Sequence, residues 1–310
     1  MILGLLLAAV IGITGYVEQS LQRVDALADY PGRVAGTSGT NWLIVGSDSR
    51  AGLSSDQAAR LATGDEAAAG GQRTDTIMLM HIPALISGGP PTLVSLPRDS
   101  SVPVPGRKGR LKLNTTFALG GPSLLVQTVE TVTGLHVDHY AEIGFGGFAR
   151  LVDDVGGVQL CPAESISDPL AGLDIPAGCQ TLDGPQALGY VRTRQSPRAD
   201  LDRVVRQREF LGALITRASS PAVLLHPLRV GPLAADAPDV VTVDDSDHVW
   251  NLARLGWAMR SLSGGDAVTT TVPIVGFGTL RDGSSGVLWD REAAGQLFTA
   301  LAEDRPVPRS

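Results

Sequence analysis

Lysine is almost absent from this sequence. It contains only Lys108 and Lys112, although lysine and arginine together number 25. Nearly all positive charge is therefore arginine, which reflects genomic base composition as well as function and lowers the weight of any single arginine. The 32 acidic residues give a net charge of −7. A chain this acidic lacks the extended basic face of a general nucleic-acid binder, so we expect no nucleic-acid partner.

Several sequence motifs of catalysis and metal binding are missing as well. The chain has no Walker A sequence, and the glycine-rich run GFGG at 144–147 is not a phosphate loop. A Gly-x-Ser-x-Gly elbow is absent, so Ser-His-Asp hydrolysis has little support. The five histidines do not have the spacing of zinc ligands. These absences remove the commonest nucleotide, serine-hydrolase and zinc chemistries.

Cysteine is limited to Cys161 and Cys179. A metal site would need two more ligands nearby, whereas an isolated pair in an exported protein indicates a disulfide. Closing a loop of this size contributes about 3 kcal/mol in the chain-entropy model. We therefore predict a structural disulfide.

The N-terminus, MILGLLLAAVIGITGYV, carries no charge over residues 1–17. As a helix it would span roughly 25 Å, close to the hydrocarbon thickness of a bilayer. No basic segment precedes it, and no convincing cleavage site follows it. We expect residues 1–17 to be a retained single-pass transmembrane helix in the cell membrane, residues 18–40 to be an extracytoplasmic linker, and the remainder to lie outside the cytoplasm.

The rest of the chain alternates apolar strands with helices. The strands are expected at 42–45, 76–80, 92–96 and 137–143, and the helices at 122–133, 146–154, 203–217, 246–262 and 290–302. This alternation predicts an α/β fold, a three-layer α-β-α sandwich with a mixed central sheet. Residues 41–218 would form the catalytic core. Residues 219–310, with a β-like run at 268–275, would complete the same sheet.

Six arginines fall between residues 192 and 208, in the run YVRTRQSPRADLDRVVRQR. If Tyr190, Arg192 and Arg194 lie on a strand, they share one face, because side chains repeat every two residues. Asp200 or Asp202 can cap the following helix, on which Arg203 and Gln207 are neighbours four residues apart. Converging guanidinium groups match a multiply charged anion such as a diphosphate. The alternative is a solvated basic helix.

Further polar residues stand at the ends of the predicted strands. Asp48 and Arg98 follow two strands, while Arg73 and Asp75 enter a third two residues apart. Open α/β sheets bind ligands outside the carboxyl ends of their strands. Two aspartates in an anion site make sense when a divalent cation bridges them to phosphate oxygens, which is typical of Mg²⁺.

Seven segments in this order resemble the LytR-CpsA-Psr family of cell-wall glycopolymer transferases. They are IVGSDSR (44–50), RTDTIML (73–79), VSLPRDSSVPVPG (94–106), KLNTTFALGGP (112–122), VDHYAEIGFGGFARLVDDVGGV (137–158), LDGPQALGYVRTR (182–194) and DLDRVVRQ (200–207). Together they span roughly residues 41–218. Several long motifs in register are far more specific than any one short pattern.

The resemblance implies a membrane-anchored, Mg²⁺-dependent phosphotransferase that works outside the cytoplasm of a Gram-positive-type cell. Such enzymes take a glycopolymer from a polyprenyl-diphosphate carrier and attach it to peptidoglycan through a phosphodiester bond. The acceptor is a muramic acid hydroxyl. The cysteine pair and its loop are similar to the actinobacterial branch, where the polymer is often arabinogalactan.

The family pattern also implies roles for particular residues. Asp48 and Asp75 correspond to the ligands of Mg²⁺ (or Mn²⁺). The residues that correspond to diphosphate contacts are Arg73, Arg98, Arg192, Arg194 and Arg203, with Asp200 and Gln207 in supporting or phosphate contacts. The catalytic group would be Asp75, Arg73, Arg98, Arg192 and Arg194. Asp202 departs from the pattern, because many relatives carry glycine there.

Three questions stay open at this point. Asp75 or Asp99 could accept the proton of the attacking hydroxyl. The lining of an isoprenoid groove could come from Phe117, Leu124, Leu125, Val126, Phe145 and Phe148, which fit an ordinary core equally well. The same site would also serve a polyprenyl-diphosphate hydrolase, or a non-catalytic anchored protein that binds the lipid carrier or has a regulatory role.

Overall fold

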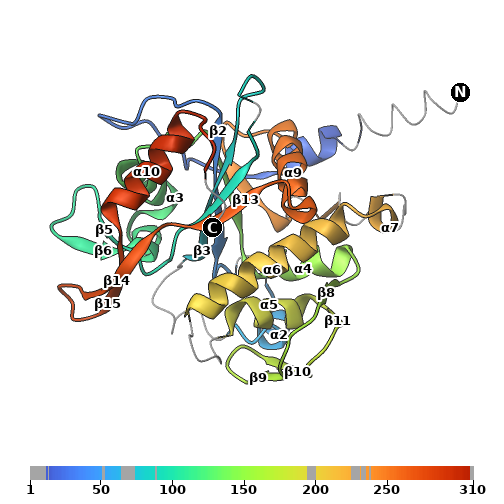
Figure 1. Ribbon diagram of the computed structural model, residues 1–310. Helices are drawn as coiled ribbons and strands as arrows, with labels where there is room; N and C mark the ends of the chain where they lie inside the picture. Colours follow the sequence, from blue (N-terminus) through green and yellow to red (C-terminus); the bar gives the residue numbers. More distant parts are fainter. Residues whose placement is uncertain are drawn as a thin grey trace, which may run out of the picture.

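The computed structural model describes residues 12, 14–50, 53–63, 74–87, 89–193, 200–224, 231, 235–236 and 239–307, and only the backbone of 200–204, 224 and 263. Within these residues a mixed seven-stranded sheet forms the centre of the fold (Figure 1). Its strands, in spatial order, are β1 (Gln22–Val24), β12 (Thr242–Asp244), β7 (His139–Ile143), β2 (Thr40–Ser47), β3 (Thr74–Ile82), β4 (Thr92–Ser95) and β13 (Val268–Thr271).

The strands β2 and β3, at the centre of the sheet, carry apolar residues on both faces, as expected for strands covered on both sides. β2 pairs antiparallel with β3, with Trp42 opposite Met80, and parallel with β7. The carboxyl end of β2 therefore lies beside the carboxyl end of β7 and the start of β3. This edge gathers the polar residues that follow or precede these strands.

Helices cover both faces of the sheet (Figure 1). On one face Leu43 and Val45 of β2 pack with helices α3 (Leu113–Thr133) and α10 (Arg291–Ala302). On the other face Trp42 packs with α9 (Val249–Gly264) and with Leu211 of α6 (Asp200–Ala218). Each apolar side chain buried this way contributes roughly 1.5–3 kcal/mol relative to exposure. The layered α/β fold with a mixed central sheet is as predicted.

A smaller group of elements packs below α6. It consists of α2 (Ser55–Arg60), α4 (Phe145–Asp154), α5 (Gly184–Arg192), α7 (Pro221–Leu224) and the antiparallel pairs β8 (Val158–Leu160) with β11 (Gln180–Leu182) and β9 (Ile166–Asp168) with β10 (Leu173–Ile175). On the opposite side lie the hairpins β5 (Ser101–Pro103) with β6 (Arg110–Lys112) and β14 (Ile274–Thr279) with β15 (Ser285–Trp289).

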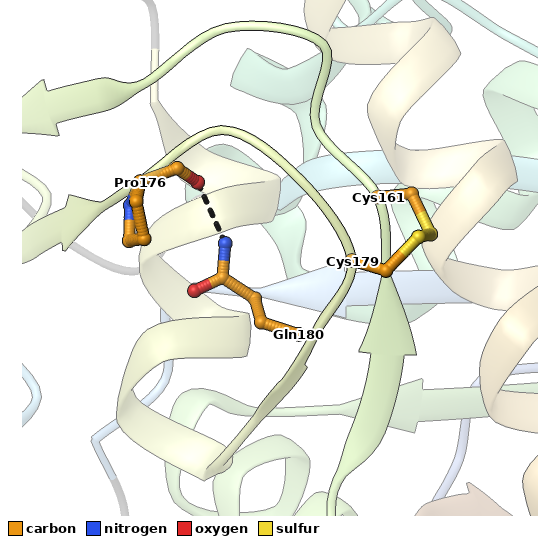
Figure 2. The surroundings of a disulfide bond; sticks show 4 residues. All are labelled: Cys161, Pro176, Cys179 and Gln180. Carbon is orange, nitrogen blue, oxygen red and sulfur yellow. Dashed lines mark hydrogen bonds between the residues drawn. A yellow bond between two sulfur atoms is a disulfide. The ribbon is translucent and has the colours of Figure 1, made fainter.

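Cys161 and Cys179 form a disulfide at the ends of the β8–β11 pair, as predicted (Figure 2). The loop that it closes contains β9 and β10, and the Gln180 amide donates a 2.7 Å hydrogen bond to the carbonyl oxygen of Pro176 inside it. The disulfide thus holds together a part of the chain whose strands are only three residues long.

The segment 190–194 was expected as a strand, but its described residues, 190–193, do not form one. Tyr190 and Arg192 belong to α5, which ends at Arg192. The helix begins with a capping box: Asp183 accepts from the backbone N–H of Gln186, and the side chain of Gln186 accepts from the backbone of Asp183. This start signal overrides the β preference of the Tyr-Val pair.

Helix α3 begins nine residues earlier than predicted, at Leu113 rather than at Pro122. The helical backbone is broken at Gly120 and Gly121, and Gly121 has a φ of 65°. Proline fits the first turn of a helical segment, which is why the sequence pattern placed the start at Pro122. The other long helices and the four strands predicted in the core lie where expected.

The expectation that the N-terminal segment is a linker is partly wrong, because residues 22–24 form the edge strand β1. The turn after β1 is held by Asp244, whose carboxylate accepts from the backbone N–H groups of Ala26 (2.9 Å) and Leu27 (2.8 Å) and from Ser246. Most of the expected transmembrane segment lies outside the described residues. Among the residues described, no helix has the length and apolar character required to span a bilayer.

Candidate functional site

Two predicted aspartates lie at the same edge of the sheet. β2 ends at Ser47, which pairs with Thr74 at the start of β3, so Asp48 directly follows one strand and Asp75 is the second residue of its neighbour. Asp75 forms an ion pair with Arg98, which stands in the turn after β4. The structure thus joins three of the predicted residues from three strands.

The turn that carries Arg98 is fixed by backbone hydrogen bonds. The N–H of Asn114 donates to the carbonyl of Arg98 at 2.9 Å, which ties the turn to the start of α3. The guanidinium of Arg98 also lies 3.6 Å from Asp99, and Asp99 pairs with Lys112 at 3.1 Å. Arg98 is therefore held in position between two carboxylates, with only 14% of its side chain exposed.

Arg192 reaches the same edge from the end of α5. Its guanidinium donates to the carbonyl oxygens of Leu61 (3.0 Å) and Ala62 (3.1 Å), and it lies 4.7 Å above the ring of Phe145. Backbone acceptors and the face of an aromatic ring both stabilise a cation without neutralising it. Arg192 consequently keeps a full positive charge at the site.

Electrostatics link Arg192 to the two aspartates. Burial is the main cause that lowers the pKa of Arg192, and the positive charge of Arg50 lowers it further. The carboxylates of Asp75 and Asp48 act in the opposite direction and raise it. The fields of these groups overlap at Arg192, as the predicted convergence requires.

Arg50 belongs to this site although the sequence prediction assigned it no role. One of its terminal nitrogens donates to the carbonyl of Thr63, while its Nε is buried with no hydrogen-bond partner among the described residues. A buried guanidinium N–H costs free energy when it is unpaired, so this atom suits an anion oxygen. Arg50 follows the same strand end as Asp48. The rule that ligands bind outside the carboxyl ends of strands would therefore have identified it.

Gln207 and Arg206 of α6 contact the backbone at the end of α5. Gln207 is buried and donates to the carbonyl of Val191 at 3.4 Å, and buried Arg206 donates to the carbonyl of Thr193 at 2.7 Å. Thr193 in turn donates to Asp168 at 2.7 Å. These contacts fix the chain directly after Arg192. The prediction assigned Arg206 no role, but through Thr193 it holds the backbone next to Arg192 in place.

Four predicted residues cannot be placed. Arg73 and Arg194 lie outside the described residues, and the side chains of Asp200 and Arg203 lie outside them as well. The backbone of both latter residues belongs to the first turn of α6. The roles expected for these four residues stay predictions.

The donor set fits a hard divalent cation. Nowhere in the described part of the chain do three or more His, Cys, Asp or Glu residues group as a metal cage would require. Two carboxylates beside arginines match Mg²⁺, which takes one or two protein carboxylates and keeps water and phosphate oxygens as its other ligands. Asp48 and Asp75 are the residues that would hold it.

A cleft of about 450 Å³ adjoins this edge at Ser49. Helix α3 contributes Phe117, Gly121 and Pro122 to its wall, and β1 contributes Val24. The other residues expected to line a groove make contacts elsewhere in the fold. Leu125 and Val126 are core residues, Phe148 packs on Phe210, and Phe145 lies under Arg192.

Comparison with known proteins agrees with this architecture. The LytR_cpsA_psr family pattern matches residues 17–303. The chain is 53% identical over 295 residues to the probable cell wall biosynthesis protein LcpB of Corynebacterium glutamicum, covering 95% of this chain and 68% of that protein.

Two more distant relatives extend the comparison. The polyisoprenyl-teichoic acid–peptidoglycan teichoic acid transferase TagU of Enterococcus faecalis is 38% identical over 130 residues, which cover 42% of each chain. The structure of a LytR-Csp2A-Psr enzyme from Actinomyces oris superposes with a TM-score of 0.69 at 23% identity, covering 91% of this chain and 96% of that one. Because the family pattern spans nearly all of the chain, the protein is a member of the LytR-CpsA-Psr family.

Proposed function

We propose that this protein transfers a glycopolymer from a polyprenyl-diphosphate carrier to peptidoglycan, outside the cytoplasm and anchored by residues 1–17. The site supports this function because two carboxylates and three arginines gather at one edge of the sheet beside a cleft. The names of LcpB and TagU, a cell wall biosynthesis protein and a teichoic acid transferase, are consistent with it.

The observation that carries the proposal is the position of Arg192. A half-buried guanidinium held by two backbone carbonyls, with Asp48 and Asp75 in its field, is fixed before any ligand binds. At an effective dielectric constant of about 20, a unit charge pair 4 Å apart contributes about 4 kcal/mol. The interaction energy of two such cations, Arg98 and Arg192, with a diphosphate is large enough to select a doubly charged group over a neutral one.

The proposed reaction is a phosphoryl transfer. A muramic acid hydroxyl of peptidoglycan attacks the sugar-proximal phosphorus, a new P–O bond forms, and the bond to the bridging oxygen breaks. The products are a glycopolymer–peptidoglycan phosphodiester and polyprenyl phosphate, and the hydroxyl proton is lost. Such reactions require mainly alignment and charge neutralisation. Arg98 and Arg192 would orient the phosphates and stabilise the charge on the leaving group.

Mg²⁺, when bound by Asp48 and Asp75, would supply additional neutralisation of the phosphate oxygens. The ion pair with Arg98 orients the Asp75 carboxylate at this edge. Asp99 is engaged by Lys112 and Arg98, so its negative charge is already balanced by two cations. Asp75 and Asp99 are both candidates to accept the hydroxyl proton.

The cleft beside Ser49 provides a place for the first isoprene units of the carrier. Phe117, Val24 and Pro122 give it an apolar wall, and its lining includes Ser49, the residue after Asp48. A lipid diphosphate bound with its head at the arginines would place its tail in this direction. The remaining length of the tail would stay in the membrane.

The test uses the purified chain, a synthetic polyprenyl-diphosphate glycan and peptidoglycan. The proposal expects phosphodiester-linked product that depends on Mg²⁺ and on peptidoglycan. Release of polyprenyl phosphate at the same rate without peptidoglycan would identify a hydrolase instead. An Asp75→Asn variant should lose turnover, while an Asp174→Asn variant, altered at an exposed residue of β10, should not. Equal turnover by the parent and Asp75→Asn would contradict the proposed site.

A further inference from the structure

Helix α9 exposes an unusual face. Trp250 is 59% exposed and Trp257 is 77% exposed, although tryptophan is normally among the more buried side chains. Arg254 lies between them and is exposed as well. Residues three and four apart on a helix are neighbours, so these three side chains form one stripe.

The opposite side of α9 accounts for its packing in the fold. Leu255 and Ala258 are buried, and Leu252, Met259 and Leu262 pack with them against Trp42 and the sheet. The tryptophan stripe therefore is not needed for the core. It presents apolar area to the surroundings, and a tryptophan ring can bury 150–250 Å² when it finds a partner.

The charge of this helix is one-sided. Between Val249 and Gly264 the sequence VWNLARLGWAMRSLSG contains two arginines, Arg254 and Arg260, and no acidic residue, within a chain of net charge −7. Both arginines are exposed. A face with aromatic rings and arginines matches the interface of a bilayer that contains anionic lipids, where rings sit at headgroup level and arginines pair with phosphates.

The location of the stripe agrees with that partner. Residues 14–20 are helical and directly continue the uncharged run 1–17, and this helix packs at the beginning of α9 (Figure 1). Glu18 accepts from the backbone N–H of Val249 at 2.9 Å and pairs with His248 at 2.7 Å. The ring of His248 stacks on Trp250 at 4.2 Å. The stripe thus begins at the point where the apolar N-terminal segment joins the domain.

We propose that the Trp250–Arg254–Trp257 stripe of α9 docks on the membrane surface beside the N-terminal segment, with Arg260 as an additional contact to anionic headgroups. This inference rests on the membrane location in the proposed function. α9 packs against α6, whose first turns carry Gln207 and Arg206. Docking through α9 therefore fixes the orientation of the candidate site relative to the bilayer from which a lipid carrier must come.

Tryptophan fluorescence of the full chain tests the docking. The protein has four tryptophans, none of them in residues 1–17, so the N-terminal segment itself gives no signal. Trp42 is fully buried, and Trp289 is half-buried and donates to Ser100 at 2.8 Å. The chain would be reconstituted in anionic phospholipid vesicles whose acyl chains are either ordinary or brominated.

Bromine quenches rings that enter the interface, so brominated lipid should roughly halve the emission, since two of the four tryptophans carry the stripe. The Trp250→Phe/Trp257→Phe variant should lose this quenching, whereas Trp289→Phe should retain it. Arg254→Gln/Arg260→Gln should weaken the quenching several-fold, and Arg150→Gln, a change at a half-buried arginine of α4, should leave it unchanged.

Absence of quenching in the parent, or equal quenching in the parent and Trp250→Phe/Trp257→Phe, would overturn the inference. Glycopolymer transfer is measured separately on the same vesicles. Transfer without quenching leaves the proposed function standing and removes the docking face, which then would be a surface for a protein or a second copy. Quenching without transfer supports the docking face and contradicts the proposed function.

Discussion

Replacement of Arg192 by alanine tests the candidate site most directly. The change removes the two hydrogen bonds to Leu61 and Ala62 and the contact with the ring of Phe145. It also removes the cation that faces Asp48 and Asp75. The variant should therefore lose both stability and activity, by amounts that can be separated.

The stability loss follows from these contacts. A hydrogen bond to a charged group contributes about 1.5–3 kcal/mol, and a partly desolvated cation–π contact adds about 1 kcal/mol. Relief of the burial penalty on the guanidinium offsets part of this. We expect about 3 kcal/mol of destabilisation, which lowers the melting temperature of a domain this large by roughly 6–12 °C. The loss of one preorganised charge from the transition state should cost a factor of about 10²–10³ in turnover.

Arg192→Lys separates the two effects. Lysine keeps the charge but lacks the planar fork that serves two carbonyls, so stability should fall less and turnover should recover only in part. Arg150→Ala is the matched control, because Arg150 is a half-buried helical arginine whose ion-pair partner Asp239 is exposed. Thermal melts and transfer assays below the melting temperature measure both properties. Turnover of Arg192→Ala within a factor of three of the parent would refute a role in charge stabilisation.

Three further changes test the supporting structure. Cys161→Ser should destabilise the protein by about 3 kcal/mol in the absence of reductant, and a melt of the parent with dithiothreitol should approach the variant. Gly184→Ala should lower the free energy of unfolding by several kcal/mol and lower turnover, because its Cβ would lie 2.4 Å from the carbonyl oxygen of Ala149. Gly212→Ala, which has open space around it, should raise the free energy of unfolding by about 0.5–1 kcal/mol. Burial would raise the pKa of Asp244, but its hydrogen bonds lower it overall, so its contribution is present above about pH 4 and is lost as the pH falls through the folded-state value. Asp244→Asn should therefore cost about 2 kcal/mol at pH 7 in urea titrations and progressively less as the pH falls below about 4, and a cost that does not decrease with falling pH would contradict this assignment.

The sequence predicted the parts of the fold that local patterns determine. The apolar runs of β2, β3 and β4 and the amphipathic period of α6 and α9 each identify an element. The alternation of these elements then predicts the layers. The start of α3 was misjudged because the break at Gly120 and Gly121 makes two helical segments look like one loop and one helix.

The site was predicted less completely, for a different reason. Asp48, Asp75 and Arg98 follow from strand ends, and the structure brings them together. Arg192 was assigned to the wrong element, because alternation in a short segment cannot outweigh a capping box upstream. The contacts of Arg206 and Gln207 depend on how α6 packs against the end of α5, and no local pattern reports that contact.

The contact between α6 and the end of α5 predicts that arginine rather than lysine is needed at position 192. A diphosphate site must present its charges before the ligand arrives, because reorganisation during the reaction costs free energy. Arg192 is fixed by carbonyls from the segment after α2 and by an aromatic ring from α4, and its own helix is fixed by Arg206 through Thr193. A flexible ammonium could supply the charge but could not connect these elements. The same residue therefore holds the local fold together and sets the electrostatic potential of the site, which predicts that stability and turnover decline together along the series Arg, Lys, Ala.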